Sequence, residues 1–431
     1  MRDFATSDDP AVQAQLDRLG ALSVPQGRLG LETIRAMLAR LGDPQHRLPP
    51  VFHVAGTNGK GSTCAFLRAM LEAQGLSVHV ATSPHLVRYN ERIRIAGRLI
   101  ADAELASLLA EVLDACEDLS PSFFEVTIAA SFMAFARHPA DACVIEVGLG
   151  GRFDATNVLE QPAACGVASL GIDHEAFLLA PEMGTPADPM ARIGFEKAGI
   201  AKPGVPLVTQ AYPPEVTKAV IDQAMQAGAK TAIRDLDWRA EAGAAISYRD
   251  RHGELDLPLP AMPGAHQADN AALAVAMLRH QDKVVVSPQA MAQGIGAAHW
   301  PARMQRLGTG PLIATAGERE VWLDGGHNPD AGAALARHFA GARLHLILGM
   351  MANKDPQALI APLSGNLASV QVVPVPGKDS HEAAAFGPQA RAARDVAEAL
   401  RALPDDGVPV LVAGSLYLAG EVLRLNRQPP D

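Results

Sequence analysis

The sequence is poor in aromatic residues and cysteine, and it carries no net positive charge. Phe, Trp and Tyr make up 4% of 431 residues, the chain has four cysteines, and its formal net charge is −10. A protein without an overall positive field is poorly suited to nonspecific binding of nucleic acid or of an anionic membrane. We therefore expect small-molecule substrates and neither nucleic acid nor a membrane as partners.

The arrangement of the few cysteines argues against a CxxC redox pair and against a zinc site. They are far apart, form no CxxC pair and have no His partner at zinc spacing; they are Cys64, Cys116, Cys143 and Cys165. Cys143 and Cys165 lie in apolar, strand-like runs, and we expect them to be buried as small hydrophobic residues. This usage suits a reducing compartment, so the expected location is the cytoplasm. As a separate expectation, we expect the protein to be a monomer.

Long hydrophobic segments are missing as well. The N-terminus, MRDFATSDDP, lacks the apolar core of a signal peptide, and no apolar run approaches the roughly 20 residues that span a bilayer. What remains is an ordinary globular balance of 48% hydrophobic and 19% charged residues. The length is enough for two or three domains.

The most informative segment is VFHVAGTNGKGST, at 51–63. Apolar residues typical of a strand lead into a glycine-rich turn, and a helical pattern starts at Lys60. This arrangement directs free backbone amides and a helix N-terminus at a phosphate group. Lys60 can add a positive charge, and Ser62 or Thr63 a hydroxyl for Mg²⁺.

The segment departs from the strict Walker pattern, in which Lys is followed directly by Ser or Thr, because Gly61 follows Lys60. The alternative is a tight strand-to-helix turn in which glycines only provide positive φ angles. Such a turn needs no Lys and two hydroxyls together, so we favour phosphate binding.

Predicted strands and helices alternate along the chain, which indicates a mainly parallel sheet with helices on both faces. A second strand–helix series follows Trp300-Pro301, our expected domain boundary. Within this scheme we expect a hairpin at 91–100, helices at 102–118 and 122–137, strand-like pieces at 245–258, a loop at 177–192 that contains Pro181, Pro186 and Pro189, and one long helix at 382–402.

Several polar residues directly follow predicted strands of the first series. They are Ser83, Glu146, Asp173 and His174. If the strands are parallel, these residues converge near the glycine-rich turn, where they could bind Mg²⁺ directly or through water. Histidine is an unusual magnesium ligand. For Glu146 the alternative is a solvated strand end, but its apolar neighbours predict burial, and a buried carboxylate needs a partner.

Other candidates have ordinary alternatives. Lys197, in GFEKAGIAK, could be a surface lysine on a helix, and Phe123-Phe124 could be plain core. Asp324 and His327 follow a strand in the second series, where LDGGHNPDA repeats the strand–turn–helix pattern. The sequence has no GxSxG motif, which argues against a Ser/His/Asp hydrolase of that type.

Taken together, these motifs resemble the folylpolyglutamate synthase and dihydrofolate synthase family, relatives of the Mur ligases. The resemblance covers nearly the whole chain and keeps the family's order of motifs. They are GTNGKGS (56–62), TSPHLVRYNERI (82–93), FFE (123–125), EVGLGGRFDATN (146–157), DHEAF (173–177), EKAGI (196–200), LDGGHNP (323–329) and GSL (414–416).

The resemblance implies an α/β fold with two domains. Residues 1–300 would form a P-loop NTPase-like, mainly parallel sheet domain that binds ATP and the pterin or folate substrate. Residues 301–431 would form a smaller Rossmann-like α/β domain that closes over ATP and binds glutamate. The implied reaction is ATP-dependent amide formation, in which an acyl phosphate is displaced by the amine of L-glutamate, with Mg²⁺ at two sites.

The resemblance also implies roles for individual residues. Lys60, Lys197 and His174 would be catalytic, with Lys197 carbamylated, which requires a neutral amine of lowered pKa. ATP would be bound by Gly56, Thr57, Asn58, Gly59, Lys60, Gly61 and Ser62, and from across the interdomain cleft by Asn270, Arg303, Asp324 and His327. Metal ligands would be Ser62, Ser83, Glu146 and His174. The pterin or folate would contact Arg28, Leu29, Gly30, Leu31, Phe123, Phe124, Glu125, Phe153, Asp154 and Ala155.

Some features depart from the family pattern. The spacer between His174 and Lys197 is longer than expected, Ile128 stands where Thr is expected, and Ala302 where Gly is common. SPHLVRYNERIRI is most similar to bacterial enzymes with both the dihydropteroate and the folyl-glutamate activity. Two alternatives stay open: a Mur-type ligase acting on a UDP-sugar acid, and a nucleotide-binding homologue without turnover.

Overall fold

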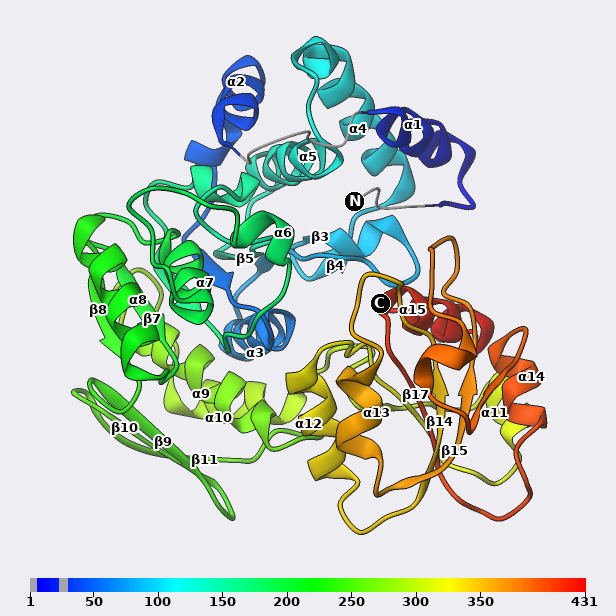
Figure 1. Cartoon of the computed structure of the whole chain (residues 1–431). Coiled ribbons are helices and arrows are strands. Elements are labelled where there is room, and N and C mark those ends of the chain that lie inside the picture. The colour runs from blue at the N-terminus through cyan, green and yellow to red at the C-terminus, as the bar shows by residue number, and fades with distance from the viewer. Residues whose placement is uncertain (1–5, 23–29) are drawn as a thin grey trace. The chain divides into compact units, whose positions relative to one another are not determined.

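The computed structural model describes residues 6–22 and 30–431 (Figure 1). The chain divides into two compact units. The first comprises Met1–Pro84, Tyr89–Ala261 and Gln267–His299. The second comprises His85–Arg88, Met262–His266 and Trp300–Asp431, so two short segments from the earlier part of the chain belong to it.

The first unit is built on an eight-stranded sheet. Its strands, in spatial order, are β4 (Arg98–Leu99), β3 (Ile93–Ile95), β2 (Val78–Ala81), β5 (Ala142–Glu146), β1 (Val51–Ala55), β6 (Ala164–Val167), β7 (Pro206–Thr209) and β8 (Lys230–Ile233). Only β3 and β4 are antiparallel to their neighbours. The mainly parallel sheet and the hairpin at 91–100 are therefore confirmed, whereas β8 was not predicted.

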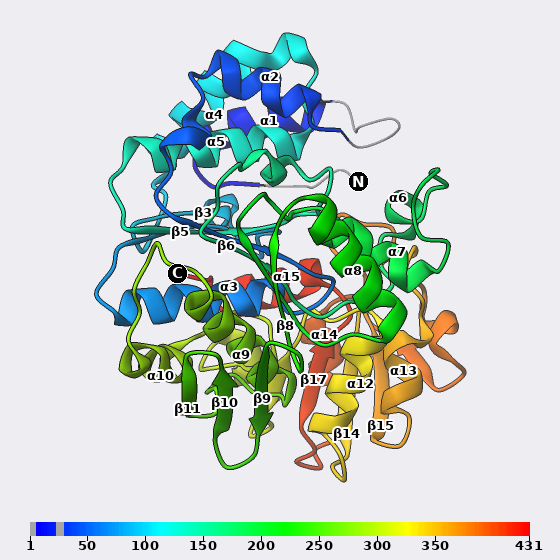
Figure 2. The same ribbon diagram turned by 90° about the vertical axis from the view of Figure 1, so that its left-hand side faces the viewer.

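Helices cover both faces of this sheet. On one face lie α3 (Lys60–Ala73), α9 (His266–Arg279) and α10 (Pro288–Ala297), and on the other lie α5 (Phe123–Arg137), α7 (Pro189–Ala198) and α8 (Pro214–Gln226). Along β6 the residues alternate accordingly, because Gly166 faces Met277 of α9 while Cys165 and Val167 join the cluster of α7 and α8. Figure 2 shows α5 between the sheet and an outer layer of α1 (Pro10–Ala21), α2 (Glu32–Arg40) and α4 (Asp102–Cys116).

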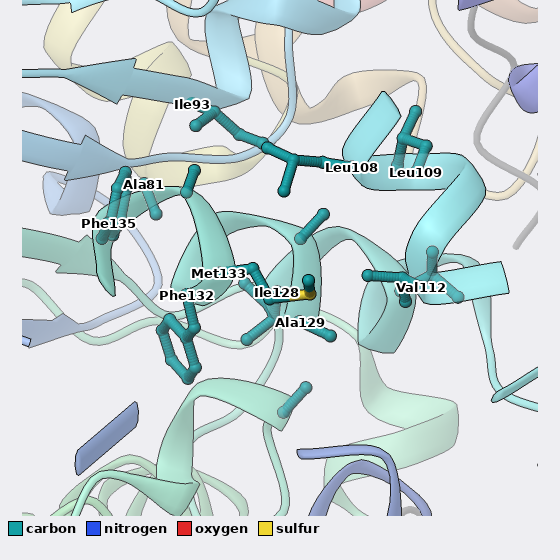
Figure 3. Packing of buried hydrophobic residues seen from close by; sticks show 14 of the residues in the cluster. Ala81, Ile93, Leu108, Leu109, Val112, Ile128, Ala129, Phe132, Met133 and Phe135 are labelled. Atoms are coloured by element: carbon teal, nitrogen blue, oxygen red, sulfur yellow. The ribbon is translucent and has the colours of Figure 1, made fainter. Parts of the chain in front are cut away.

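Helix α5 is the centre of a large hydrophobic core of this unit. Its residues from Val126 to Phe135 are all buried, as expected for a helix that is apolar on every side. Figure 3 shows Phe132, Met133 and Ile128 among side chains from α4 and the sheet. Ser122 and Glu125 form a capping box at the start of α5, which fixes where the helix begins. The prediction that Phe123-Phe124 opens a helix is confirmed.

A separate antiparallel sheet follows in the first unit, in the order β11 (Gly253–Leu257), β10 (Ile246–Asp250) and β9 (Trp238–Ala242). Strands β10 and β11 match the strand-like pieces expected at 245–258, and β9 was not predicted. All four cysteines are buried and free, as expected for Cys143 and Cys165. Within the described residues, no helix has both the length and the apolar composition that crossing a membrane requires.

The second unit has a six-stranded sheet, parallel except for β12. The order is β12 (Gln305–Arg306), β13 (Val321–Leu323), β17 (Val410–Ala413), β14 (Leu344–Leu348), β15 (Leu367–Val372) and β16 (Ala390–Ala392). One face packs against α11 (Pro311–Ala316), α14 (Val396–Arg401) and α15 (Leu416–Leu425), and the other against α12 (Pro329–His338) and α13 (Gln357–Leu363). The expected smaller α/β domain is therefore present.

The long helix predicted at 382–402 is wrong. This segment forms a 3₁₀ turn, η5 (Ala383–Phe386), then β16 and the short helix α14. Gly387, with φ of 104°, and Pro388 interrupt the segment, because neither residue favours the interior of a helix. Its many Ala and Arg residues gave a helical propensity that these two residues and the edge of the sheet override.

Candidate functional site

The glycine-rich turn joins β1 to α3 as predicted. Gly56 and Gly59 have backbone φ angles of 149° and 84°, which residues other than glycine rarely adopt. Gly59 is the N-cap of α3, so the amides of Lys60, Gly61 and Ser62 lie in its first turn and have no acceptor within the helix. The Lys60 amine donates to the Gly56 carbonyl at 3.1 Å. The positive charge and the helix N-terminus are therefore held at one place.

The turn is fastened to the segment that follows β6. The amides of Thr57 and Asn58 donate to the carbonyl of Ser169 at 2.8 and 3.2 Å. The Thr57 hydroxyl donates to the carbonyl of Gly171 at 2.8 Å. These two amides are thus used to fix the turn, which leaves the amides at the start of α3 as the donors available to a phosphate group.

Asn270 lies on α9, in the first unit, and directly against this turn. A Cβ atom on Gly59 would lie 2.3 Å from Asn270 Oδ1, so glycine is required there for space as well as for its φ angle. The side chain of Asn270 is buried and donates to Gln267 Oε1 at 3.1 Å. The expectation that Asn270 reaches ATP from across the interdomain cleft is wrong, because α9 packs on the same sheet as the turn.

Ser83 lies just after β2, Glu146 is the last residue of the neighbouring strand β5, and the two residues lie together. The Ser83 amide donates to Glu146 Oε2 at 3.2 Å, and Glu146 is only 5% exposed. The alternative of a solvated strand end is therefore wrong. Strand β5 lies between β2 and β1, so both residues are at the carboxyl edge of the sheet, beside the glycine-rich turn. Ligands of parallel sheets bind at this edge.

These residues fit a magnesium ion that binds together with a nucleotide. Among the described residues, no group of three or more His, Cys, Asp or Glu side chains could hold a metal by itself. Mg²⁺ typically takes one or two carboxylates and completes its shell with water and substrate phosphates. Glu146, with hydroxyls of Ser62 and Ser83 at the same edge, offers such an all-oxygen set.

His174 follows β6 and caps the short helix α6 (Glu175–Leu178). Its φ is 54°, a left-handed conformation that costs free energy in residues other than glycine and is often found at functional sites. Its Nε2 lies 4.0 Å from Asp173 Oδ2, and a third of the side chain is exposed. An accessible imidazole beside a carboxylate could bind a metal, so its predicted role stays a prediction.

Lys197 is buried, so the alternative of a surface lysine is wrong. Only 4% of the residue is exposed, and burial lowers the pKa of its amine to about 7. The positive charge of Lys60 lowers this pKa further, whereas Asp173 and Asp154 act in the opposite direction. The amine is therefore largely able to lose its proton near neutral pH, and it lies within electrostatic reach of the glycine-rich turn.

The GLGGR turn after β5 packs directly on the end of α7. The amide of Arg152 donates to the carbonyl of Glu196 at 2.8 Å. A Cβ atom on Gly151 would lie 2.7 Å from the Glu196 oxygen and 3.0 Å from Lys197 Cα, so any larger residue would displace the helix. The position of Lys197 therefore depends on this turn.

A network of four charged side chains, which the sequence did not suggest, joins the turn to α7 and to the long loop before it. Arg152 contacts Glu182 at 2.5 Å and Glu196 at 2.8 Å, and Arg192 contacts the same two carboxylates at 3.1 and 3.0 Å. The expected loop at 177–192 is partly wrong, because Pro189 already starts α7 with Asp188 as N-cap. Its other part is held down by Glu182.

The long loop borders a pocket of about 400 Å³ in the first unit. Apolar side chains, among them Phe153 and Phe177, line it together with the charged network. The Arg152 guanidinium lies 4.2 Å from the centre of the Phe153 ring. Nearby, the Phe124 ring covers Gly148, where a Cβ atom would lie only 2.4 Å from the ring. Two of the predicted pterin residues thus flank the same turn.

Asp154 is 4% exposed and closes this turn. Its Oδ1 accepts from the Thr156 amide at 3.0 Å and hydroxyl at 2.5 Å, and its Oδ2 accepts from the Leu149 amide at 2.8 Å. Burial raises the pKa of the Asp154 carboxyl group. Ala155, the next predicted substrate residue, is buried at the start of η4 (Ala155–Val158).

The remaining predicted substrate residues have structural surroundings of their own. Phe123 packs on the core of α4 and α5, which favours the plain-core alternative. Glu125 uses its carboxylate in the capping box of α5. Leu31 is the buried N-cap of α2, with Gly30 directly before it, whereas 28–29 lies outside the described residues. Their contacts with a substrate stay predictions.

In the second unit, Asp324 lies against the residue that follows Arg303. Asp324 is buried and its Oδ2 accepts from the Met304 amide at 2.8 Å; His327 lies in the turn that follows β13. Arg303 stands between two residues of positive φ, Ala302 at 53° and Met304 at 46°. Glycine would adopt the left-handed backbone of Ala302 at less cost in free energy than alanine does.

Known proteins resemble this chain in sequence over most of its length. A family model described as Mur ligase, glutamate ligase domain, matches residues 302–416. Folylpolyglutamate synthase of Lacticaseibacillus casei is 32% identical over 416 residues, which cover 90% of this chain and 92% of that protein. Dihydrofolate synthase/folylpolyglutamate synthase of Bacillus subtilis is 31% identical, with 91% and 94% covered.

Solved structures give the same result for the fold. E. coli FolC in complex with DHPP and ADP superposes with a TM-score of 0.85, at 32% identity, over 97% of both chains. The bifunctional folylpolyglutamate synthase/dihydrofolate synthase of Yersinia pestis, complexed with AMPPNP and Mn, has a TM-score of 0.83 at 31% identity, over 98% of this chain and 99% of that one. By sequence along nearly its entire length, and by fold, this chain belongs to the folylpolyglutamate synthase and dihydrofolate synthase family.

Proposed function

We propose that the protein is an ATP-dependent ligase that joins L-glutamate to dihydropteroate and also adds glutamate to reduced folates. The observation that carries this proposal is the convergence of Lys60, Ser83, Glu146 and Lys197 at the carboxyl edge of one sheet, around a helix N-terminus. Such a site combines phosphate-binding amides, a carboxylate for a metal and two amines. The relatives' names supply the class of substrate.

In this proposal the chain positions two anions and neutralises them. The amides of Lys60, Gly61 and Ser62 and the Lys60 amine hold the phosphates of ATP, so that the acceptor carboxylate can take the γ-phosphoryl group and become an acyl phosphate. The glutamate amine then displaces phosphate and forms the amide. Ser62, Ser83 and Glu146 would hold Mg²⁺, which, when bound, neutralises charge on the phosphoryl group.

Lys197 has a further role in the proposal, as a carbamate. A neutral lysine amine can add CO₂, and burial gives the Lys197 amine a pKa of about 7, so a large neutral fraction exists at physiological pH. The carboxylate formed in this way, together with His174, would hold a second metal ion. The contacts of Gly151 and Arg152 with α7 hold Lys197 in place for this purpose.

The two sequence regions would bind different substrates. Residues 1–300 would bind ATP and the acceptor, the latter through Phe124, Phe153 and Asp154, and residues 301–431 would bind glutamate and contact ATP through Arg303, Asp324 and His327. The ligands named in this proposal are supported by E. coli FolC solved with DHPP and ADP, and by a bifunctional relative solved with Mn, AMPPNP and L-glutamate bound. We also propose a monomer in the cytoplasm, where four free, buried thiols would stay reduced.

A coupled assay of phosphate release tests the reaction. Release should require ATP, dihydropteroate and glutamate together, and Lys60→Ala should reduce kcat at least about 10²-fold, because it removes a charge that acts on the transferred phosphoryl group. Release without either acceptor would contradict the proposal. Turnover of UDP-muramoyl compounds would favour a Mur-type ligase, and nucleotide binding without product would favour a homologue without turnover.

The role of Lys197 has its own test. Lys197→Ala should abolish activity, and a short carboxylic acid such as acetate or propionate should restore part of it by replacing the carbamate in the space that the side chain leaves. Lys202→Ala, which removes a nearby lysine that is not part of the proposed site, is the matched control. Full activity of Lys197→Ala without added acid would exclude the proposed carbamate.

A further inference from the structure

A buried chain of hydrogen bonds runs from the middle of the sheet to Asp154. His53 lies on β1, and its Nε2 is 2.8 Å from the hydroxyl oxygen of Thr156 in η4. The same hydroxyl is 2.5 Å from Asp154 Oδ1. His53 and Thr156 are completely buried and Asp154 almost so. The mechanism proposed above gives neither His53 nor Thr156 any role.

The chemistry of the three groups fixes the direction of this chain. The Thr156 hydroxyl has a single proton, which it donates to Asp154 Oδ1. Its oxygen can therefore only accept from His53, which must carry a proton on Nε2. His53 Nδ1 has no hydrogen-bond partner among the described residues, as expected for the bare nitrogen of a neutral imidazole. The direction is His53 to Thr156 to Asp154.

Asp154 in turn connects the two ends of the turn that borders the proposed acceptor site. Its other oxygen accepts from the Leu149 amide at the start of the turn, while Thr156 lies at its end. Directly before Leu149, Gly148 supports the Phe124 ring, and between Leu149 and Thr156, Gly151 packs on Lys197. A carboxylate that rotated away from Thr156 would release this turn.

From this geometry we infer that His53 and Thr156 are positioning residues, which hold the Asp154 carboxylate and thereby shape the acceptor side of the site. Neither touches a substrate in the proposed function; both act through Asp154. The inference rests on the proposed function only for the identity of the acceptor. It predicts that loss of either hydrogen bond weakens use of the acceptor more than use of ATP.

Two matched pairs of variants test it. Thr156→Val keeps the shape and removes the hydroxyl, whereas Thr156→Ser keeps the hydroxyl. Likewise, His53→Met removes the donor, whereas His53→Gln keeps an N–H near the position of Nε2. We expect KM for dihydropteroate to rise about tenfold in Thr156→Val and His53→Met, from the loss of one buried hydrogen bond, with KM for ATP within about twofold. The Ser and Gln variants should stay near wild type.

The double variant decides whether the two residues act as one unit. Combining His53→Met with Thr156→Val should raise KM for dihydropteroate no further than Thr156→Val alone, because both remove the same chain. Equal values for Thr156→Val and Thr156→Ser, or equal shifts for ATP and acceptor, would overturn the inference. If one Thr156 variant does not fold, the His53 pair gives the same comparison. A wild-type enzyme that does not use dihydropteroate would refute the proposed function instead.

Discussion

At the scale of single residues, Lys197 lies on α7 with its amine enclosed by protein, although its neighbours in the sequence are those of an ordinary helix surface. The motif EKAGI singled out Lys197 only through its resemblance to the family. The burial of Lys197 comes from Gly151 and Arg152, which are distant in the sequence. Glu146 was easier to judge, because continuous apolar residues flank it on its own strand. Sequence reasoning thus finds burial that a strand creates and misses burial that a distant turn creates.

His53 gives a prediction for the dependence of stability on pH. Burial lowers the pKa of its imidazole to about 3, below the ordinary value of 6.5. The unfolded chain therefore binds a proton at this residue below pH 6.5 and the folded chain does not, so its contribution to stability is present above that pH and is lost as the pH falls toward 3. His53→Gln cannot titrate. When the pH is lowered from 7.5 to 5, the unfolding free energy should therefore decrease by about 2 kcal/mol less in His53→Gln than in wild type.

Urea unfolding of wild type and His53→Gln at both pH values measures this difference. His46→Gln, which removes a half-exposed histidine, serves as the control and should follow wild type. An identical loss of stability in wild type and His53→Gln would mean that His53 is accessible to protons in the folded protein.

At the scale of elements, alternation of strands and helices was predictable because the central strands of a parallel sheet are short, nearly continuous apolar runs that alternate with helical patterns. The errors have physical causes. Strands β8 and β9 are short and carry charged residues, so they resemble loops in the sequence. The long loop before α7 was recognised by its prolines, but its attachment through Glu182 depends on Arg152 and Arg192, which belong to other elements.

Glu182→Gln should loosen that loop. Replacing a largely buried, doubly paired carboxylate weakens two ion pairs, about 1 kcal/mol in total after screening by solvent, so local opening should become about fivefold more frequent. Met183, which is 98% exposed, is a natural cleavage site there. Thermolysin should cut before Met183 correspondingly faster. Glu175→Gln removes an exposed charge from the adjoining helix and should not change the rate. Equal rates for both variants would show that Glu182 does not hold the loop.

At the scale of the whole molecule, both sheets were expected from the two series of strands and helices. A prediction for the complete chain concerns linkage between nucleotide binding and stability. AMPPNP with Mg²⁺ should raise the unfolding free energy of the first unit by about 2.7 kcal/mol at a concentration of 100 times Kd, because only the folded glycine-rich turn binds it. Calorimetry should show a higher transition temperature, and Lys60→Ala should remove most of the increase. An equal increase in Lys60→Ala would place the nucleotide elsewhere.

The short segment His85–Arg88 has a consequence for the synthesis of this chain and for its engineering. Leu86 and Val87 pack on the core of the second unit, and the Leu86 carbonyl comes so near α15 that Gly420 has no room for a Cβ atom. The ribosome synthesises His85–Arg88 long before residues 300–431, so the second unit cannot complete its core from its own contiguous residues. A chimera that exchanges everything after His299 for the corresponding part of a relative would therefore also need the relative's equivalent of His85–Arg88. Without it, a gap would remain in the core of the second unit where Leu86 and Val87 pack.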